Sequence, residues 1–291
     1  MRYWILRHSL CYFAGLACAL GTIQAEEPPV PPPTDQEATN QEATAQEASD
    51  QEASDQEASD QETARLQLQL KQLIAQLSEQ IQQTPGESAL YSRRGDALFF
   101  KGDFQAAVAD YNKMIELNPA ISASHWRRGI ACFYAKQYQE AAKQFEIYHS
   151  FDNVDRENGI WRFFSQYKAK GPEAAQAGLL KYEKDDREPF PDLYRMFQGK
   201  TTPEAVLKNI ETADIDAGER NKRYFYAYLY IGLNESLHGQ RERARQFLKK
   251  SVANEWGPTA GFGPNYMWHT GRLELQLLTR PGRNPDTNPE E

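Results

Sequence analysis

The chain has 291 residues, a formal net charge of −8 at neutral pH and 12% aromatic residues. This length allows one or two domains, and the aromatic content is sufficient for a sizeable core. The charge is unevenly spread: residues 26–62 hold 12 acidic residues and no basic ones, whereas residues 63–291 hold 31 of the 33 basic and 29 of the 41 acidic residues. The sequence contains no basic tract, which argues against a nucleic-acid partner.

Residues 1–25 have the pattern of an export signal. Arg2 and Arg7 precede an apolar run at 10–23, and a small-residue cleavage site ends at Ala25. The run is shorter than the ~20 residues that span a bilayer, which favours a cleaved signal peptide. A retained membrane anchor is the alternative.

The three cysteines bear on membrane attachment and on disulfide formation. Lipidation of Cys18 is a third way to reach a membrane, although Gly15 stands where a bacterial lipobox has leucine. Cleavage after Ala25 would leave Cys132 alone, so no disulfide could form within the mature chain. We expect Cys132 to be a buried structural thiol in the second repeat described below.

Residues 26–62 are Pro-rich and then consist of QEASD-type pentads. A period of five gives no continuous apolar face on a helix or a strand, so we expect a disordered linker. A solvated spacer is the favoured role, and a binding tail is the alternative.

Residues 63–84 have helical periodicity. Their leucines and one isoleucine recur every three or four residues, and Pro85-Gly86 follows them. The pattern predicts an amphipathic helix with two alternative roles: a cap on the next repeat, or a dimerisation helix that makes a homodimer.

Residues 88–121 and 122–155 repeat one pattern with a period of 34. Gly95 and Gly129 correspond, as do Ala107 and Ala141. Each copy predicts two helices joined by a tight turn, with small residues where the helices approach closely. Such units bury only one face each and must stack, so the sequence predicts an array of helical hairpins.

These residues resemble the tetratricopeptide repeat family. The family pattern has, in order, an aromatic residue, Gly, Leu or an aromatic residue, Ala, an aromatic residue and Pro, and this sequence matches it in register. The first copy supplies it as Tyr91, Gly95, Leu98, Ala107, Tyr111 and Pro119, whereas the second has Asn153 in place of the proline. The resemblance implies an all-α solenoid over 85–279. We expect divergent hairpins at 156–224, a third clear repeat at 225–258, a capping helix at 264–279 and a flexible tail at 280–291.

The sequence contains no recognisable catalytic, cofactor or metal motif, so we expect a non-enzymatic protein that binds a protein or peptide. In the family, the first helix of each repeat lines a concave surface. Transferred to this sequence, the implied partner groove consists of Ser92, Asp96, Phe99, Phe100, Trp126, Ile130, Phe133 and Tyr134. Arg93, Arg94, Arg127 and Arg128 form a recurring basic patch that would pair with Asp103 or Asp110 or with an acidic partner. In the alternative hypothesis the helix at 157–170 fills the groove.

The order of these parts also resembles NlpI-type lipoproteins of bacterial envelopes. The local similarities include Met196–Gly199 and Phe247–Asn254. This resemblance implies a periplasmic or envelope-associated homodimeric adaptor that binds cell-wall hydrolases or a processing protease. A structural assembly factor with a self-filled groove is the alternative function. An enzyme with a site between Trp161 and Arg195 is a third hypothesis.

Overall fold

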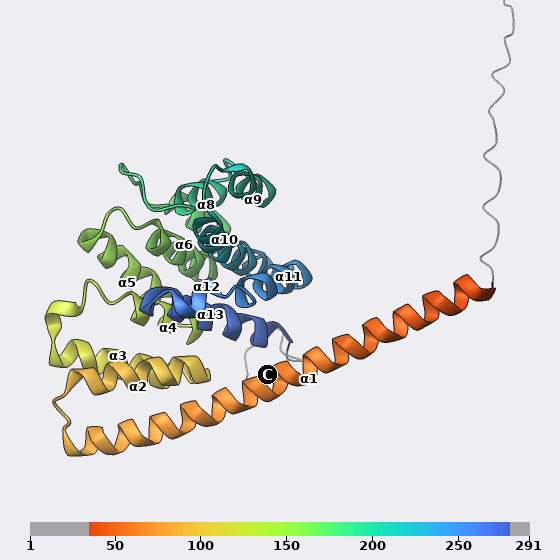
Figure 1. The fold of residues 1–291 in the computed structure, drawn as a ribbon. Coiled ribbons are helices and arrows are strands. Elements are labelled where there is room, and N and C mark those ends of the chain that lie inside the picture. The colour runs from red at the N-terminus through yellow and green to blue at the C-terminus, as the bar shows by residue number, and fades with distance from the viewer. Residues whose placement is uncertain (1–34, 280–291) are drawn as a thin grey trace, which may run out of the picture. The chain divides into compact units, whose positions relative to one another are not determined.

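The computed structural model describes residues 35–279, and within them every regular element is a helix. The prediction of an all-α chain built from helical hairpins is confirmed (Figure 1). The chain divides into two compact units, and the boundary between Ser59 and Asp60 falls inside α1. The helices are α1 (Asp35–Gln83), α2 (Ser88–Lys101), α3 (Phe104–Leu117), the 3₁₀ turn η1 (Pro119–Ile121), α4 (Trp126–Tyr134), α5 (Tyr138–Phe151), α6 (Arg156–Lys170), α7 (Pro172–Ala177), α8 (Phe190–Phe197), α9 (Pro203–Thr212), α10 (Ala217–Leu237), α11 (Arg241–Val252), α12 (Trp256–Thr259) and α13 (Phe262–Thr279).

The first helix begins earlier than the sequence predicts. Residues 35–62 were expected to be disordered, but α1 starts at Asp35 and runs without a break to Gln83. The pentads lack an apolar face, but they are rich in Ala, Glu and Gln and contain neither Gly nor Pro between 35 and 65. High intrinsic helix propensity therefore accounts for this difference. The predicted signal peptide, residues 26–34 and the tail at 280–291 lie outside the described residues.

The C-terminal part of α1 is buried within the single chain. Leu70, Leu77 and Ile81 are 6%, 1% and 8% exposed, and Ser78 accepts a hydrogen bond from Arg94 of α2 at 3.0 Å. This supports the cap alternative over the dimerisation helix, because the apolar stripe already has partners inside the protomer.

The small residues of the repeat pattern set the packing inside each hairpin. A Cβ atom placed at Gly95 would lie 2.7 Å from the Tyr111 ring, and one at Gly129 would lie 2.5 Å from the Phe145 ring. The third hairpin, α10–α11, repeats this arrangement with Gly232 and Leu248. Glycine is thus required at these positions because the facing large side chain occupies the space of a methyl group.

The turns between paired helices are equivalent but not identical. Gly102 and Gly239 take left-handed backbone conformations, with φ of 92° and 73°. Lys136 stands at the same point of the second hairpin with φ of 61°. A side chain at such a position costs about 1 kcal/mol relative to glycine, so the second turn carries a cost that the others avoid.

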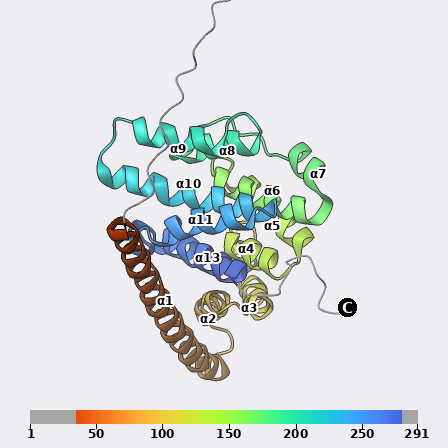
Figure 2. The same cartoon turned by 90° about the vertical axis from the view of Figure 1, so that its right-hand side faces the viewer.

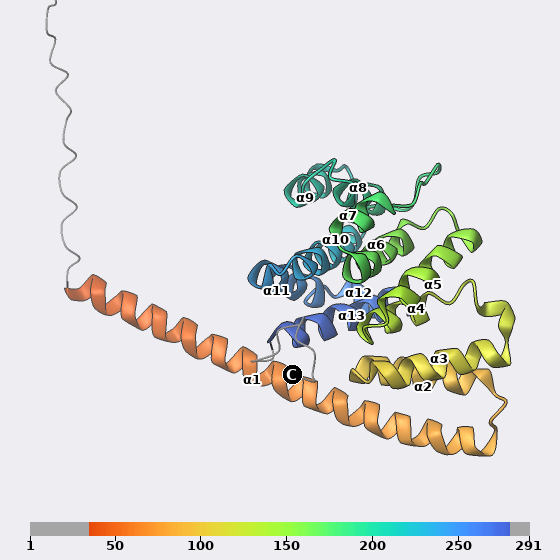
Figure 3. The ribbon, with the colours of Figure 1, turned by 180° about the vertical axis from the view of Figure 1, so that it is seen from behind.

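Helix α13 joins the two ends of the array. It packs along α11 of the last hairpin and also contacts α2 of the first (Figure 2). The Arg272 guanidinium donates to the Phe100 carbonyl at 2.7 Å across this contact. Seen from behind, α13 lies between α11 and α4 (Figure 3). Residues 60–279 therefore enclose α13 on several sides.

Candidate functional site

The predicted groove over the first repeat is occupied by α13. Phe99 is fully buried and stacks on Tyr266 with ring centroids 4.9 Å apart. Phe100 stacks on His269 at 3.9 Å. At the start of the second repeat, Trp126 also packs edge-on against Tyr266 at 5.0 Å. The groove is therefore closed here by aromatic side chains of the chain's own C-terminal helix.

The rest of the second repeat is covered mainly by α6 and α3. Phe133 contacts Trp161 of α6 at 5.6 Å, as the alternative hypothesis of a self-filled groove expected, and Ile130 is 1% exposed. Tyr134 packs against Phe104 at 5.1 Å. The sequence did not indicate α13 as a second cover, although the aromatic run from Phe262 to His269 was a signal that could have done so.

The polar residues of the predicted groove form a link between repeats. Arg127 donates to Asp96 at 2.6 Å and to Ser92 at 3.1 Å. The Tyr111 hydroxyl donates to the same carboxylate at 2.7 Å. Burial raises the pKa of Asp96, and the Arg127 guanidinium opposes that rise. These side chains stabilise the stacking of the first two hairpins.

The predicted basic patch is largely engaged within the chain. Arg94 makes a two-point contact with Asp110, at 2.8 and 2.7 Å, which is one of the pairings that the sequence suggested. Arg128 donates to Asn112 at 2.6 Å. Arg93 is exposed. The four arginines therefore do not form one surface for an acidic partner.

Helix α13 leaves two openings at its ends. The C-terminal half of α13 borders a cavity of about 570 Å³, here called the turn cavity because the α2–α3 and α4–α5 turns form one of its walls. The N-terminal end of α13 borders a second cavity of about 390 Å³, here called the tryptophan cavity because Trp126, Trp161 and Trp256 line it. The predicted groove residues are split between them, with Phe133 and Tyr134 at the first and Trp126 and Ile130 at the second.

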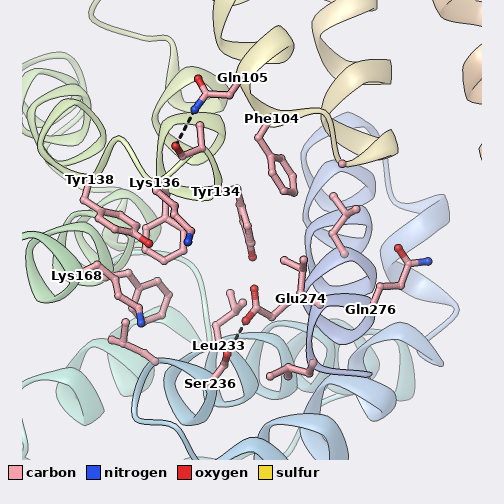
Figure 4. A pocket seen from close by; sticks show the side chains of 18 of the residues that line it. Phe104, Gln105, Tyr134, Lys136, Tyr138, Lys168, Leu233, Ser236, Glu274 and Gln276 are labelled. Atoms are coloured by element: carbon pink, nitrogen blue, oxygen red, sulfur yellow. Dashed lines mark hydrogen bonds between the residues drawn. The ribbon is translucent and has the colours of Figure 1, made fainter. Parts of the chain in front are cut away.

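The turn cavity combines an apolar wall with a charged rim (Figure 4). Tyr134 points toward Glu274 across the cavity, and the Ser236 hydroxyl donates to that carboxylate. Burial raises the pKa of Glu274, while the hydroxyls of Ser236 and Tyr134 oppose the rise. The apolar lining comes from Phe104, Phe133, Tyr138, Phe164, Leu233, Leu237, Leu273 and Leu277, and the basic lining from Lys101, Lys136, Lys168 and Arg241.

A partly buried ion cluster lies at the tryptophan cavity. Arg187 pairs with Glu157, with Asp155 at 3.3 Å and with Asp186 at 3.2 Å, and its guanidinium lies 4.2 Å from the centroid of the Phe190 ring. These contacts join the loop before α8 to α6.

Glu157 is the most perturbed carboxyl group of this cluster. It accepts a hydrogen bond from the Tyr230 hydroxyl, which in turn accepts one from the Trp161 ring nitrogen at 3.1 Å. Burial raises the pKa of Glu157 to about 7, and Arg187 opposes that rise. This chain of contacts connects α6 to α10 and holds the divergent middle of the array in place.

Three further properties concern the residues that the structure describes. Between residues 35 and 279 no group of three or more His, Cys, Asp or Glu side chains is arranged to hold a metal ion. Cys132 is buried, and burial raises the pKa of its thiol to about 11. None of the helices in this part of the chain has the length and apolar character needed to cross a bilayer.

Comparison with known proteins adds one structural similarity. No family model matches the sequence, and no curated protein matches it. Among solved structures, the chain is similar to a tetratricopeptide repeat protein from Parabacteroides merdae, with 15% identity and a TM-score of 0.40. The match covers 74% of this chain and 80% of that one. The assignment of helical hairpins rests on the packing described above.

Proposed function

We propose that this chain is an exported, non-catalytic scaffold that binds an extended segment of a partner protein in the turn cavity. The observation that carries the proposal is the cavity itself, which has a volume of about 570 Å³ and an aromatic and aliphatic wall on the inner side of the hairpin array. Sites of this size and composition are typical of pockets that take an apolar group and fix it with a few polar contacts.

The chemistry of the wall suggests what such a segment offers. An aromatic or aliphatic side chain would pack against Phe104, Phe133 and Leu277. The Gln276 amide is part of the lining and would meet the backbone of the bound segment. The Gln105 amide already donates to the Ala135 carbonyl at 3.0 Å and accepts from Gln137 at 2.9 Å (Figure 4). One buried apolar anchor surrounded by polar contacts is a common mode of peptide recognition.

The turn cavity replaces the groove predicted from the sequence as the proposed binding site, because Trp126 of that groove is packed against α13. A Trp126→Ala substitution would remove contacts with Tyr266 and Phe262, so it would test the fold and not the binding. The turn cavity keeps Phe133 and Tyr134 from the predicted groove but adds residues from α10 and α13.

A substitution that fills the cavity tests the proposal. Gln276 lines the turn cavity, and we expect Gln276→Trp to block it and to raise the Kd of a bound peptide at least tenfold, about 1.4 kcal/mol. Peptides are first selected from a randomised library on the full chain and then measured by fluorescence polarisation. Gln246→Trp on α11 is the matched control, because Gln246 is exposed and lines neither cavity. Equal affinity in both variants would contradict a site in the turn cavity.

The closure by α13 favours one other candidate function, a structural assembly factor with a self-filled groove. This alternative requires a stable oligomer, such as a homodimer, and needs no peptide site. Sedimentation equilibrium of the full chain separates the two candidates. A monomer that binds selected peptides supports the scaffold, whereas a stable oligomer that binds none supports the assembly factor.

Export and the identity of the partners are proposed from the sequence. The pattern of residues 1–25 supports secretion into a bacterial envelope, and the resemblance to NlpI-type lipoproteins supports cell-wall hydrolases or a processing protease as partners. Fractionation of cells that express the full chain, beside a Cys18→Ser version, tests both the compartment and the anchor. Recovery in the cytoplasmic fraction would contradict export.

A further inference from the structure

We propose that the tryptophan cavity binds one pyranose ring of a neutral saccharide in which every hydroxyl is equatorial, as in a β-glucopyranoside. The tryptophan cavity shares no lining residue with the turn cavity, so this inference goes beyond the scaffold function and does not rest on it. Three properties of the lining carry it: accessible indole rings, unused hydrogen-bonding capacity and a balance of charge.

The apolar surface of the cavity comes from several helices. Trp126 of α4 and Trp256 of α12 are half-buried and present accessible indole surface, whereas Trp161 of α6 is 1% exposed. Trp126 packs against Tyr266 at 5.0 Å and Trp256 packs against Tyr226 at 5.6 Å, so aromatic neighbours hold both indoles in place. Because the indoles come from different helices, a ring-shaped ligand can meet an apolar wall on more than one face.

The two accessible indoles also hold unused hydrogen-bond donors. Trp161 donates to the Tyr230 hydroxyl at 3.1 Å, and Trp268, which lines neither cavity, donates to a backbone carbonyl at 2.8 Å. The ring nitrogens of Trp126 and Trp256 have no hydrogen-bond partner among the described residues, and neither nitrogen is enclosed. An indole N–H in a cavity wall usually finds a partner, so these two donors indicate a ligand with acceptor oxygens.

The carboxylates at the cavity have acceptor capacity to spare. Glu157 accepts one hydrogen bond from Tyr230 and one from Arg187, whereas a carboxylate has about four acceptor positions. A ligand that meets both the indole donors and these acceptors needs groups that accept and donate at once. Hydroxyl groups have this property.

The charge balance of the lining argues against an ionic ligand. Asp155 and Glu157 line the cavity together with Arg187 and Lys222, so the formal charges cancel. Arg187 already pairs with both carboxylates, and Lys222 pairs with Glu219 at 3.0 Å. A cation would have to displace Arg187, and an anion would meet two carboxylates. Either would leave a partly buried charge without its counter-ion, which is costly.

A β-glucopyranoside combines the required properties in one ring. All of its hydroxyls are equatorial and lie around the edge, so both faces of the ring expose only C–H groups. The faces would pack on the indoles while the edge hydroxyls would meet Glu157 and an indole N–H. The cavity volume of about 390 Å³ lies within the range of small-molecule sites, roughly 300–1,000 Å³. An axial hydroxyl would point at an apolar wall without a partner, which is unfavourable.

Saturation-transfer NMR on the full chain tests the proposal with methyl β-D-glucopyranoside as the probe. We expect saturable binding, with saturation reaching the C–H protons of both ring faces. Methyl β-D-galactopyranoside differs by one axial hydroxyl and should bind at least about fivefold more weakly, because that hydroxyl loses its partners. No binding of the glucoside, or equal affinity for the two sugars, would overturn the proposal. Binding of the uncharged aromatic p-cresol in place of the glucoside would overturn it as well.

Two variants test whether the sugar lies in the tryptophan cavity. Trp256→Phe keeps a ring against Tyr226 but removes the indole N–H. Gly263→Leu adds a side chain to the cavity wall, and it should fold normally because no atom lies within 4 Å of the position of the Gly263 Cβ. We expect each variant to raise the Kd of the glucoside about tenfold.

Trp268→Phe is the matched control for these variants. Trp268 lines neither cavity, so its replacement should leave the Kd of the glucoside unchanged. Urea unfolding of each variant confirms that the fold is retained. Unchanged affinity in both Trp256→Phe and Gly263→Leu would place the sugar elsewhere on the chain and would overturn the proposal.

Discussion

Replacement of Gly129 by alanine is expected to destabilise the fold by about 2 kcal/mol, although alanine is the better helix former. In an exposed helix interior the same change gains up to about 1 kcal/mol. Here the new methyl group would lie 2.5 Å from the tip of the Phe145 ring, which is fully buried and cannot turn away. Overpacking of a rigid core typically costs 1–3 kcal/mol, so the steric cost outweighs the gain in propensity. Urea unfolding followed by circular dichroism measures the difference.

Gly263 in α13 is the matched control for this result. It is also helical, but no atom lies within 4 Å of the position that its Cβ would take. Gly263→Ala should be neutral or slightly stabilising. In the double variant Gly129→Ala/Phe145→Leu the shorter side chain should recover part of the loss. A stabilising Gly129→Ala would mean that the two hairpin helices separate easily, and would contradict the close-packing explanation of the repeat pattern.

Replacement of Arg187 by alanine is expected to destabilise the fold by about 2–3 kcal/mol at pH 8. Removal of one partner from a buried pair usually costs about 3–5 kcal/mol, and we reduce this value because the Arg187 side chain is 37% exposed and is screened by solvent. The loss arises because Glu157, Asp155 and Asp186 would face one another without a counter-ion. Arg195→Ala, which removes an exposed pair with Asp192, should cost only a few tenths of a kcal/mol.

The same variant should be less damaging at pH 5. The folded-state pKa of Glu157 is about 7, above its ordinary value of 4.5. A carboxyl group with a raised folded-state pKa contributes stability that is fully present below the unfolded pKa and is lost as the pH rises through the folded pKa. At pH 5 Glu157 is already protonated, so fewer charges repel one another in Arg187→Ala. Urea unfolding at both pH values measures the effect, and Glu157→Gln should reduce its pH dependence. An equal loss at pH 5 and pH 8 would contradict the electrostatic explanation.

The repeats were predictable because their packing is local. Gly95 and Tyr111, or Gly129 and Phe145, lie 16 residues apart and contact each other inside one hairpin, so a fixed period in the sequence records each contact. The class of fold and the hairpin arrangement follow from such pairs. The same locality accounts for the Arg94–Asp110 pairing, which also spans 16 residues.

The candidate site could not be predicted in the same way because distant residues form it. Tyr266 stacks on Phe99, and Glu274 faces Tyr134 across the cavity, yet nothing in either local pattern indicates the other residue. The error at residues 35–62 has a different cause. The pentads lack an apolar face, which argued against structure, but their composition favours a helix even without one.

The contact between α13 and α2 has a consequence for how the array folds. In an open array each hairpin interacts only with its neighbours, so an end can fray while the rest remains intact. Here Arg272 and Phe100 meet across 172 residues of sequence, and the last helix completes the core of the first hairpin. High contact order of this kind slows folding, because a long loop must close before the contact forms. It also couples the two ends thermodynamically, so we expect residues 84–279 to melt in one cooperative transition and not from one end.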